Sequence, residues 1–235
     1  MIAKGGKAVY GADIGILMLE AQFPRIRGDM GNALTWPFPV RYKVVRGASP
    51  DLVVRRGAEG TLNDFIAAGR ELVADGCQLI TTNCGFLAKF QAELSAALDV
   101  PVATSALMQA AAIQATLPAG RKVGILTISA DTLTDAHLSG AGVPAGTPVW
   151  GVADGCEFQR VILGNELALD VDQAERDLVA AATAFQAEHP ELSAILFECT
   201  NMPPYKDAVK VATGLPVYSI ETYLIWLHAA LAQDC

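Results

Sequence analysis

The stretch Leu79-Ile-Thr-Thr-Asn-Cys-Gly-Phe86 decides the fold, because a second stretch of the same form occurs later in the chain. It is a short apolar run that ends at a cysteine among small polar residues. Ile195-Leu-Phe-Glu-Cys-Thr-Asn-Met-Pro-Pro204 also ends an apolar run at a cysteine. Short apolar runs bounded by turn-forming residues are typical of β-strands. The sequence therefore predicts two similar strands, each followed by a cysteine.

Short apolar runs alternate along the chain with longer amphipathic stretches. The runs predict strands at residues 14–19, 42–45, 79–82, 123–128, 149–152 and 195–197. The amphipathic stretches predict helices at residues 62–74, 87–98, 107–117, 132–139, 171–188, 205–212 and 223–233. Strands separated by connections of helix length indicate a parallel, doubly wound α/β sheet.

A second strand motif is also repeated. It stands at Gly15-Ile-Leu17 and again at Gly124-Ile-Leu126, in both cases ahead of a cysteine strand. The interval from each cysteine to the next Pro-Val pair is identical as well, because the proline lies 17 residues after the cysteine in both halves. Three landmarks in the same order indicate a duplicated α/β unit.

We therefore predict an α/β protein of two similar, doubly wound parallel-sheet lobes related by a pseudo-dyad, with the active site in the cleft between them. The first lobe spans residues 1–115 and carries Cys84, and the second spans residues 116–235 and carries Cys199. The last predicted helix is apolar on one side, so we expect it to pack back on the first lobe or against a second subunit. A homodimer is expected.

Composition excludes several classes of partner. The 235 residues are 52% hydrophobic, with a net charge of −8 and a pI near 4.8. Because the chain is acidic overall, we expect no basic surface that would bind nucleic acid or anionic lipid. No apolar run reaches the roughly 18 residues of a membrane span, and no signal peptide is recognised at the N-terminus. The expected location is cytoplasmic.

The cysteines are expected to act as thiols. Their number, five, is odd, and no pair has Cys-x-x-Cys spacing, which predicts reduced thiols instead of disulfides. The three histidines lie far apart in sequence, so no metal site is expected. Neither a Gly-x-Ser-x-Gly elbow nor a Gly-rich nucleotide motif is present, so no cofactor is expected.

The two matched cysteines predict the site. Ligands of open parallel sheets bind at the carboxyl ends of the strands, where Cys84 and Cys199 face one another across the cleft. One thiolate can take a proton from one face of a carbon acid, and the opposite thiol can return a proton to the other face, as a racemase requires. The free thiol pKa of about 8.5 falls at a helix N-terminus, so we expect thiolate near neutral pH. Glu198 can orient a thiol or point away from it.

Polar residues beside the cysteines can donate hydrogen bonds to a substrate carboxylate and stabilise the enediolate that forms when the α-proton leaves. In the long first loop, Arg25 can hold a carboxylate through two hydrogen bonds. Trp36 and Phe38 can shield the reacting carbon or bind a sulfonium cation. The alternative for Trp36 is packing against the sheet or at a dimer interface. The predicted substrate-binding residues are Thr82, Asn83, Gly85, Thr127, Ser129, Thr200, Asn201 and Arg25.

Paired cysteines after equivalent strands in two similar halves resemble the aspartate/glutamate/hydantoin racemase superfamily, whose members need no cofactor. The resemblance covers nearly the whole chain. It implies that Cys84 and Cys199 are the two acid–base residues, and that Asn83, Thr200 and Thr127 contact the substrate.

The motifs depart from those of glutamate racemases, which typically have Cys-Asn-Thr at the first cysteine and Gly-Cys-Thr-His at the second. This chain has Cys84-Gly-Phe86 and Glu198-Cys-Thr-Asn201 instead. Together with the long loop at residues 20–32 and Thr35-Trp-Pro-Phe-Pro-Val40, they resemble the branch that contains the algal dimethylsulfoniopropionate lyases. The resemblance implies removal of a proton α to a carboxylate, followed by loss of dimethyl sulfide from the β carbon.

The leading prediction is a cofactor-independent racemase or epimerase of a small amino-acid-like carboxylate, an isomerase that works with two thiols. The alternative is a carbon–sulfur lyase in which the same cysteine base starts a β-elimination. A second alternative is a non-catalytic small-molecule binding protein, because such proteins also have two α/β lobes around a cleft.

Overall fold

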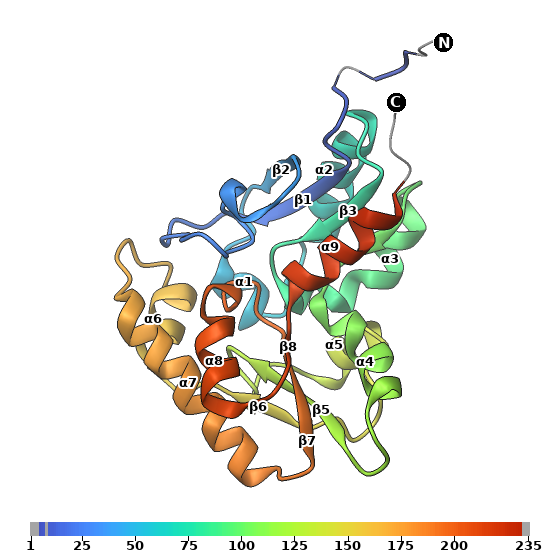
Figure 1. The fold of residues 1–235 in the computed structure, drawn as a ribbon. Helices are drawn as coiled ribbons and strands as arrows, with labels where there is room; N and C mark the ends of the chain where they lie inside the picture. The colour runs from blue at the N-terminus through green and yellow to red at the C-terminus, as the bar shows by residue number, and fades with distance from the viewer. Residues whose placement is uncertain (1–4, 8, 232–235) are drawn as a thin grey trace.

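The computed structural model describes residues 5–7 and 9–231, and it contains two four-stranded sheets (Figure 1). The first sheet has the strand order β2-β1-β3-β4 and the second has the order β6-β5-β7-β8, with every pair parallel. The second sheet therefore repeats the first, and the predicted fold of two α/β lobes is confirmed. The strands are β1 (Ile14–Leu19), β2 (Val40–Val45), β3 (Leu79–Thr82), β4 (Val102–Ala103), β5 (Lys122–Thr127), β6 (Val149–Gly151), β7 (Leu192–Phe197) and β8 (Val217–Tyr218).

The repeated Pro-Val pairs lead into the edge strands β4 and β8. In the first lobe the amide of Ile80 donates to the carbonyl of Pro101 at 3.0 Å, and in the second the amide of Ile195 donates to the carbonyl of Pro216 at 2.9 Å. A cysteine follows four residues after each isoleucine. The two lobes consequently place a cysteine at matching positions, just beyond the carboxyl ends of β3 and β7.

Helices connect the strands and cover the sheets (Figure 1). Helices α2 and α7 have the predicted bounds, whereas α3, α4 and α8 begin later than predicted, because a 3-10 helix precedes each of them. The α-helices are α1 (Pro50–Val54), α2 (Leu62–Ala74), α3 (Gln91–Ala97), α4 (Ala110–Thr116), α5 (Asp135–Gly140), α6 (Glu157–Gly164), α7 (Val171–Glu188), α8 (Lys206–Thr213) and α9 (Ile220–Ala230). The 3-10 helices are η1 (Ala33–Thr35), η2 (Gly85–Phe90), η3 (Ala106–Gln109) and η4 (Pro203–Tyr205).

The sequence patterns do not predict the short helices α1 and α6. Helix α1 starts where the hydroxyl of Ser49 accepts a hydrogen bond from the amide of Leu52 at 3.2 Å, with Pro50 at its first position. Helix α6 ends at Asn165 in the left-handed conformation, with φ 54°. The two helices belong to different lobes and contact each other, so packing between the lobes stabilises segments that are too short to form helices alone.

The last helix, α9, contacts the first lobe. The side-chain amide of Gln109 donates to the carbonyl of Ser219 at 3.0 Å, and His228 stacks on Phe38 with ring centroids 3.8 Å apart. Trp226 on the same helix is 66% exposed, and the expected homodimer stays a prediction. No helix within the described residues is long and apolar enough to cross a membrane.

We predict that Gly124→Ala destabilises the fold by about 1–3 kcal/mol, because the core has no room for a methyl group at this position. A Cβ there would lie 2.5 Å from the ring of Phe185 and 2.6 Å from the side chain of Leu192, both buried. Urea unfolding followed by circular dichroism measures the change.

Gly164→Ala is the matched control. A Cβ at Gly164 would lie 3.4 Å from the nearest atom, in the side chain of Glu166, which is an ordinary contact. Its free energy of unfolding should change by no more than about 0.5 kcal/mol. Equal stability of the two variants would show that β5 does not pack as tightly against α7 as described.

Candidate active site

A pocket lies between the lobes at the carboxyl ends of the central strands. Its walls come from the segments that follow β1, β3, β5 and β7 and from the inter-lobe helices α1 and α6. The apolar lining consists of Leu19, Phe23, Pro50, Val54, Phe86, Ile128, Ile162 and Leu163. The remaining lining residues are Asn83, Cys84, Gly85, Glu198, Cys199, Thr200 and Asn201. Apolar walls with a few convergent polar groups are typical of a small-molecule site.

Both sequence-predicted thiols lie in this pocket, where Cys84 is 9% and Cys199 is 7% exposed. The residue before each cysteine extends the hydrogen bonding of the central strands. The amides of Asn83 and Glu198 each donate to the leucine carbonyl of a Gly-Ile-Leu motif, both at 2.9 Å. This shared bond fixes the backbone at the same point in both lobes and brings the two cysteines to one pocket.

Burial raises the pKa of both thiols. For Cys84 desolvation is the largest cause of the raised pKa and the charge of Glu198 is the next, while the amide of Phe86 and the charge of Arg25 act in the opposite direction. For Cys199 desolvation again comes first and Glu198 second in raising the pKa. The expectation that a helix N-terminus lowers the thiol pKa is wrong here, because η2 is a short 3-10 helix and desolvation outweighs its amides.

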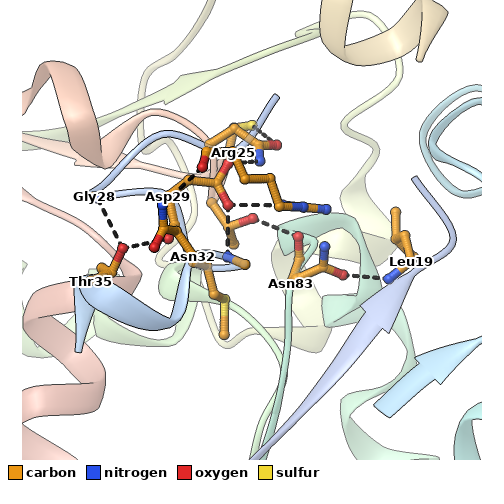
Figure 2. Close-up of polar contacts among 12 residues, drawn as sticks. Leu19, Arg25, Gly28, Asp29, Asn32, Thr35 and Asn83 are labelled. Carbon is orange, nitrogen blue, oxygen red and sulfur yellow. Dashed lines mark hydrogen bonds and ion pairs between the residues drawn. The ribbon is translucent and has the colours of Figure 1, made fainter. Parts of the chain in front are cut away.

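A direct hydrogen bond joins the lobes beside the thiols. The hydroxyl of Thr200 donates to the carbonyl of Asn83 at 2.5 Å, and the side-chain oxygen of Asn83 accepts from the amide of Leu19 at 2.7 Å (Figure 2). Both Thr200 and Asn83 line the pocket, as the sequence predicts for substrate-binding residues. Their oxygens also stabilise the contact between the lobes.

The long loop after β1 is held rigid by its own polar groups. Thr35 accepts from the amide of Gly28 at 2.9 Å and donates to the carbonyl of Asp29 at 2.7 Å, and the side-chain amide of Asn32 donates to the carbonyl of Arg25 at 2.9 Å (Figure 2). Gly28 has φ +103°, and a Cβ there would lie 2.9 Å from Cα of Pro204 in the second lobe. A glycine is therefore required for the loop to reach the other lobe.

Within this loop, Asp29 connects Arg25 to the second cysteine. Arg25 Nη1 donates to Asp29 Oδ1 at 2.9 Å, and Asn201 Nδ2 donates to Asp29 Oδ2 at 2.5 Å. The thiol of Cys199 in turn donates a hydrogen bond to Asn201 Oδ1, with Sγ 3.5 Å from the oxygen. Asp29 is only 2% exposed, and a buried carboxylate that accepts from a guanidinium is held firmly.

Arg25 also has an atom that no protein group satisfies. Its Nη2 is buried, and no hydrogen-bond partner for it exists in the described part of the chain. The guanidinium lies 4.5 Å from the ring centroid of Phe23, which lines the pocket, and Figure 2 shows it extending from its loop beyond Asp29. A buried, unpaired guanidinium nitrogen next to a pocket can bind a carboxylate oxygen.

Four of the predicted substrate-binding residues, Thr82, Thr127, Ser129 and Arg25, do not line the pocket. Thr82 is fully buried and donates to two backbone carbonyls, at 2.7 and 3.0 Å. Thr127 donates to Glu198 Oε2 at 2.8 Å, and the amide of Ser129 lies 3.4 Å from the Thr127 hydroxyl. Gly85 does line the pocket, and a Cβ there would lie 2.5 Å from the carbonyl oxygen of Glu198. Glycine thus permits close contact between the two cysteine loops.

Trp36 and Phe38 do not line the pocket. Trp36 is 7% exposed, and its Nε1 donates to the carbonyl of Met30 at 3.2 Å and to the hydroxyl of Tyr42 at 3.1 Å. Phe38 stacks on His228. The expectation that these rings shield the reacting carbon is therefore corrected. Trp36 instead packs against the sheet, through Tyr42 of β2.

Two carboxyl groups of the site could not be assigned from the sequence. Asp29 carries no motif except its position four residues after Arg25, and its partner Asn201 lies in the other half of the chain. Glu198 lines the pocket and does not point away from it. Within residues 5–7 and 9–231, no group of three or more His, Cys, Asp and Glu residues is placed to hold a metal ion.

Solved structures share this fold. A mutant of arylmalonate decarboxylase in a liganded form has a TM-score of 0.61 at 16% identity, covering 94% of this chain and 92% of that chain. An aspartate racemase homologue from Pyrococcus horikoshii OT3 has a TM-score of 0.57 at 18% identity, covering 92% and 99%. A glutamate racemase isoform from Bacillus anthracis has a TM-score of 0.58 at 17% identity, covering 95% and 84%. The fold class is that of the aspartate and glutamate racemases.

Sequence relatives narrow the family, although no family model matches the chain. A dimethylsulfoniopropionate lyase from Durusdinium sp. clade D is 30% identical over 216 residues, which are 88% of this chain and 71% of that protein. Dimethylsulfoniopropionate lyases 7 and 3 from Emiliania huxleyi are 30% and 32% identical, over 94% of this chain and over 67% and 60% of their own lengths. The chain belongs to the family of the dimethylsulfoniopropionate lyases, and its fold is that of the aspartate and glutamate racemases. These findings support an enzyme of racemase or lyase type.

We predict that iodoacetamide alkylates Cys84 and Cys199 at pH 7.5 at least about tenfold more slowly than Cys156, because reaction requires the thiolate and an accessible sulfur. Burial raises the pKa of all three thiols, but the two pocket cysteines are buried and Cys156 is only half-buried. Peptide mass spectrometry of timed samples gives the three rates, and urea-unfolded chain provides the control in which they converge. Faster alkylation of a pocket thiol would show that a stable thiolate already exists there.

Proposed function

We propose that this protein removes the proton α to a carboxylate with an active-site thiol and then expels a leaving group from the β carbon. The proposed substrate is dimethylsulfoniopropionate or a similar small β-sulfonium carboxylate. The observation that carries the proposal is a pair of cysteines in the lining of one largely apolar pocket, with the buried, unpaired Nη2 of Arg25 on a guanidinium that packs against Phe23 of that lining. The relatives at about 30% identity support elimination as the outcome.

Arg25 would bind the substrate carboxylate. Its Nη2 would donate to a carboxylate oxygen while Nη1 stays on Asp29, 2.9 Å away. Loss of the α-proton moves negative charge onto that carboxylate as an enediolate, and a fixed guanidinium stabilises the developing charge. The charge of Arg25 also lowers the pKa of the Cys84 thiol, against the larger effect of burial.

The elimination itself needs one base and an apolar space. The thiolate takes the α-proton, the electron pair of the C–H bond becomes the new C=C bond, and the bond from the β carbon to sulfur breaks with its electron pair on the leaving sulfide. Pro50, Val54, Ile162 and Leu163 provide apolar walls for the methyl groups. Exclusion of water from such walls strengthens every charge interaction in the pocket.

Racemisation is the second candidate function. It is favoured by the matched positions of Cys84 and Cys199, which come from different lobes to the same pocket. A racemase needs a base on each face of the α carbon, whereas an elimination needs only one base. A protein that only binds small molecules is the third candidate, and it requires neither thiol.

Incubation in D2O distinguishes the candidates. Purified protein is mixed with dimethylsulfoniopropionate or with single enantiomers of amino acids, and proton NMR follows the products. New vinyl signals together with dimethyl sulfide support the lyase, and loss of the α-proton signal with inverted configuration supports the racemase. Binding without exchange or elimination supports the binding protein and contradicts enzymatic action on these compounds.

We predict that the cysteine variants report the reaction type. In an elimination, Cys84→Ala or Cys199→Ala should lower kcat by at least about 10³-fold, since loss of the base removes the proton-transfer step. In a racemisation, both variants should lose activity to that extent. Cys156→Ser is the control, because this residue lies outside the pocket lining, and it should keep its kcat within about twofold. Full activity of both alanine variants would exclude thiol chemistry.

We predict that Arg25→Met lowers kcat/KM by about 10²-fold or more, since it removes a charge-assisted hydrogen bond to the substrate carboxylate. Arg27→Met is the matched control in the same loop, because the Arg27 side chain is exposed, and it should lie within about twofold of the unmodified protein. Steady-state kinetics on the substrate found in D2O compares the variants. Equal losses in both would mean that the loop acts through its fold and not through Nη2 of Arg25.

A further inference from the structure

Glu198 is a buried titratable group of the pocket that the proposed chemistry leaves without a task. It follows β7 directly, is 1% exposed and lines the pocket next to Cys199. Its Oε2 accepts from the hydroxyl of Thr127 at 2.8 Å. Across the lobe boundary, its carbonyl and carboxylate oxygens lie directly against Gly85, the residue after Cys84. Glu198 is therefore in contact with both cysteine loops.

Among residues 5–7 and 9–231, Glu198 is the carboxyl group whose charge acts on both thiols. The negative charge of Glu198 disfavours ionisation of Cys84 and of Cys199 and raises the pKa of each, whereas Asp29 does so for Cys199 alone. Asp29 is already neutralised by Arg25, 2.9 Å away. Thiolate formation in this pocket is thus coupled to the charge of Glu198.

The other elements around the pocket add no competing charge to it. Helices α1 and α6 contribute only apolar side chains to its lining, namely Pro50, Val54, Ile162 and Leu163. Their charged residues form ion pairs outside the lining, Asp51 with Arg55 and Glu157 with Arg160. In η2, Lys89 donates to the carbonyl of Gly57 at 2.6 Å. The titratable groups that face Glu198 are therefore the two thiols, with the Arg25–Asp29 pair beyond them.

We propose that Glu198 is a third acid–base residue of this active site, which takes the proton of a cysteine thiol before the α-proton is removed and releases it after turnover. This inference rests on the proposed function. The thiol S–H bond breaks, its electron pair stays on sulfur, and an O–H bond forms on the Glu198 carboxylate. The thiolate then removes the α-proton and becomes a thiol again. Release of the Glu198 proton to solvent completes an elimination with one net proton lost by the substrate.

Glu198 can change its protonation state near neutral pH. Burial raises the pKa of Glu198 to about 7, and the hydrogen bond from Thr127 acts in the opposite direction. A carboxyl group with a pKa near 7 gains and loses its proton at neutral pH. When Glu198 becomes neutral, the charge that raises the pKa of each thiol disappears. Transfer of the thiol proton to Glu198 therefore also removes the negative charge that disfavours the thiolate.

Glu198→Gln tests this role, because an amide oxygen can still accept from Thr127 but cannot take up a proton at neutral pH. We expect kcat to fall by at least about 10²-fold with KM changed by no more than about threefold. Since the carboxylate form is the proton acceptor, kcat of the unmodified protein should rise with pH through about 7, and the variant should lose this inflection. An unchanged inflection or an unchanged kcat in Glu198→Gln would overturn the proposal.

Thr127→Val is the companion variant. It removes the hydrogen bond that lowers the pKa of Glu198 and keeps the side-chain shape. The inflection in kcat should therefore move to higher pH, whereas a purely structural role for Glu198 predicts no movement. An inflection that stays in place would contradict the assignment of Glu198 as the titrating group.

Thiol alkylation separates proton transfer from simple charge effects. Loss of the negative charge lowers the thiol pKa, so iodoacetamide should alkylate Cys84 and Cys199 several-fold faster in Glu198→Gln than in the unmodified protein at pH 8. Faster alkylation together with slower turnover supports proton transfer to Glu198. Faster turnover would mean that Glu198 only suppresses the thiolate, and would overturn the proposal.

Infrared difference spectra test the titration without any substrate. The carbonyl stretch of a protonated carboxylic acid should appear as the pH falls through about 7 in the unmodified protein and be absent in Glu198→Gln. If this band is present but none of the tested compounds reacts, the proposed function fails while the titrating Glu198 stands. If the band does not titrate near neutral pH, the inference about Glu198 fails whatever the substrate is.

Discussion

One backbone hydrogen bond, made twice, governs the placement of the site. In each lobe the residue before the cysteine donates from its amide to the leucine carbonyl of the Gly-Ile-Leu strand at 2.9 Å. The bond ends the pairing of the two central strands, so the next residue must leave the sheet at its carboxyl edge. Because both lobes have the same strand order, the two edges meet and their cysteines share a pocket. The Thr200–Asn83 hydrogen bond then holds the two loops together.

Burial of this junction determines its electrostatics. Charged groups can be buried only when they are paired or when their pKa shifts toward the neutral form. Asp29 satisfies the first condition through Arg25 and Asn201, and Glu198 satisfies the second, because burial raises its pKa to about 7. The thiols follow the same rule, since burial raises the pKa of each. A thiolate can therefore form here only if a positively charged substrate stabilises it or if a nearby base accepts the thiol proton. In the proposed mechanism, Glu198 is that base.

The sequence predicts the strands and long helices of this protein better than it predicts the polar contacts between side chains. Strands β1 and β3 and helices α2 and α7 have the predicted bounds, because period and length alone distinguish long amphipathic helices from buried strands. Helices α1 and α6 escape prediction since packing between the lobes stabilises them. The bond from Asn201 to Asp29 joins residues 172 positions apart, and no local spacing can encode such a contact. Only the duplicated landmarks relate the two halves, which is why the cysteines could be paired from the sequence and Asp29 could not.

The repeat also shows where the two lobes differ, and the difference bears on the chemistry. At the position before the cysteine, the first lobe has Asn83 and the second has Glu198. Only the first lobe contributes an arginine, from the loop after β1, since β5 continues into Ile128 and Ser129. The first lobe thus places a guanidinium against Phe23 of the pocket lining, and the second lobe contributes the titrating carboxyl of Glu198. If Arg25 binds the substrate carboxylate as proposed, the substrate would be held in one orientation. That asymmetry suits a reaction in which one base acts and a group leaves, and it makes less use of the second thiol than an exchange between two faces would.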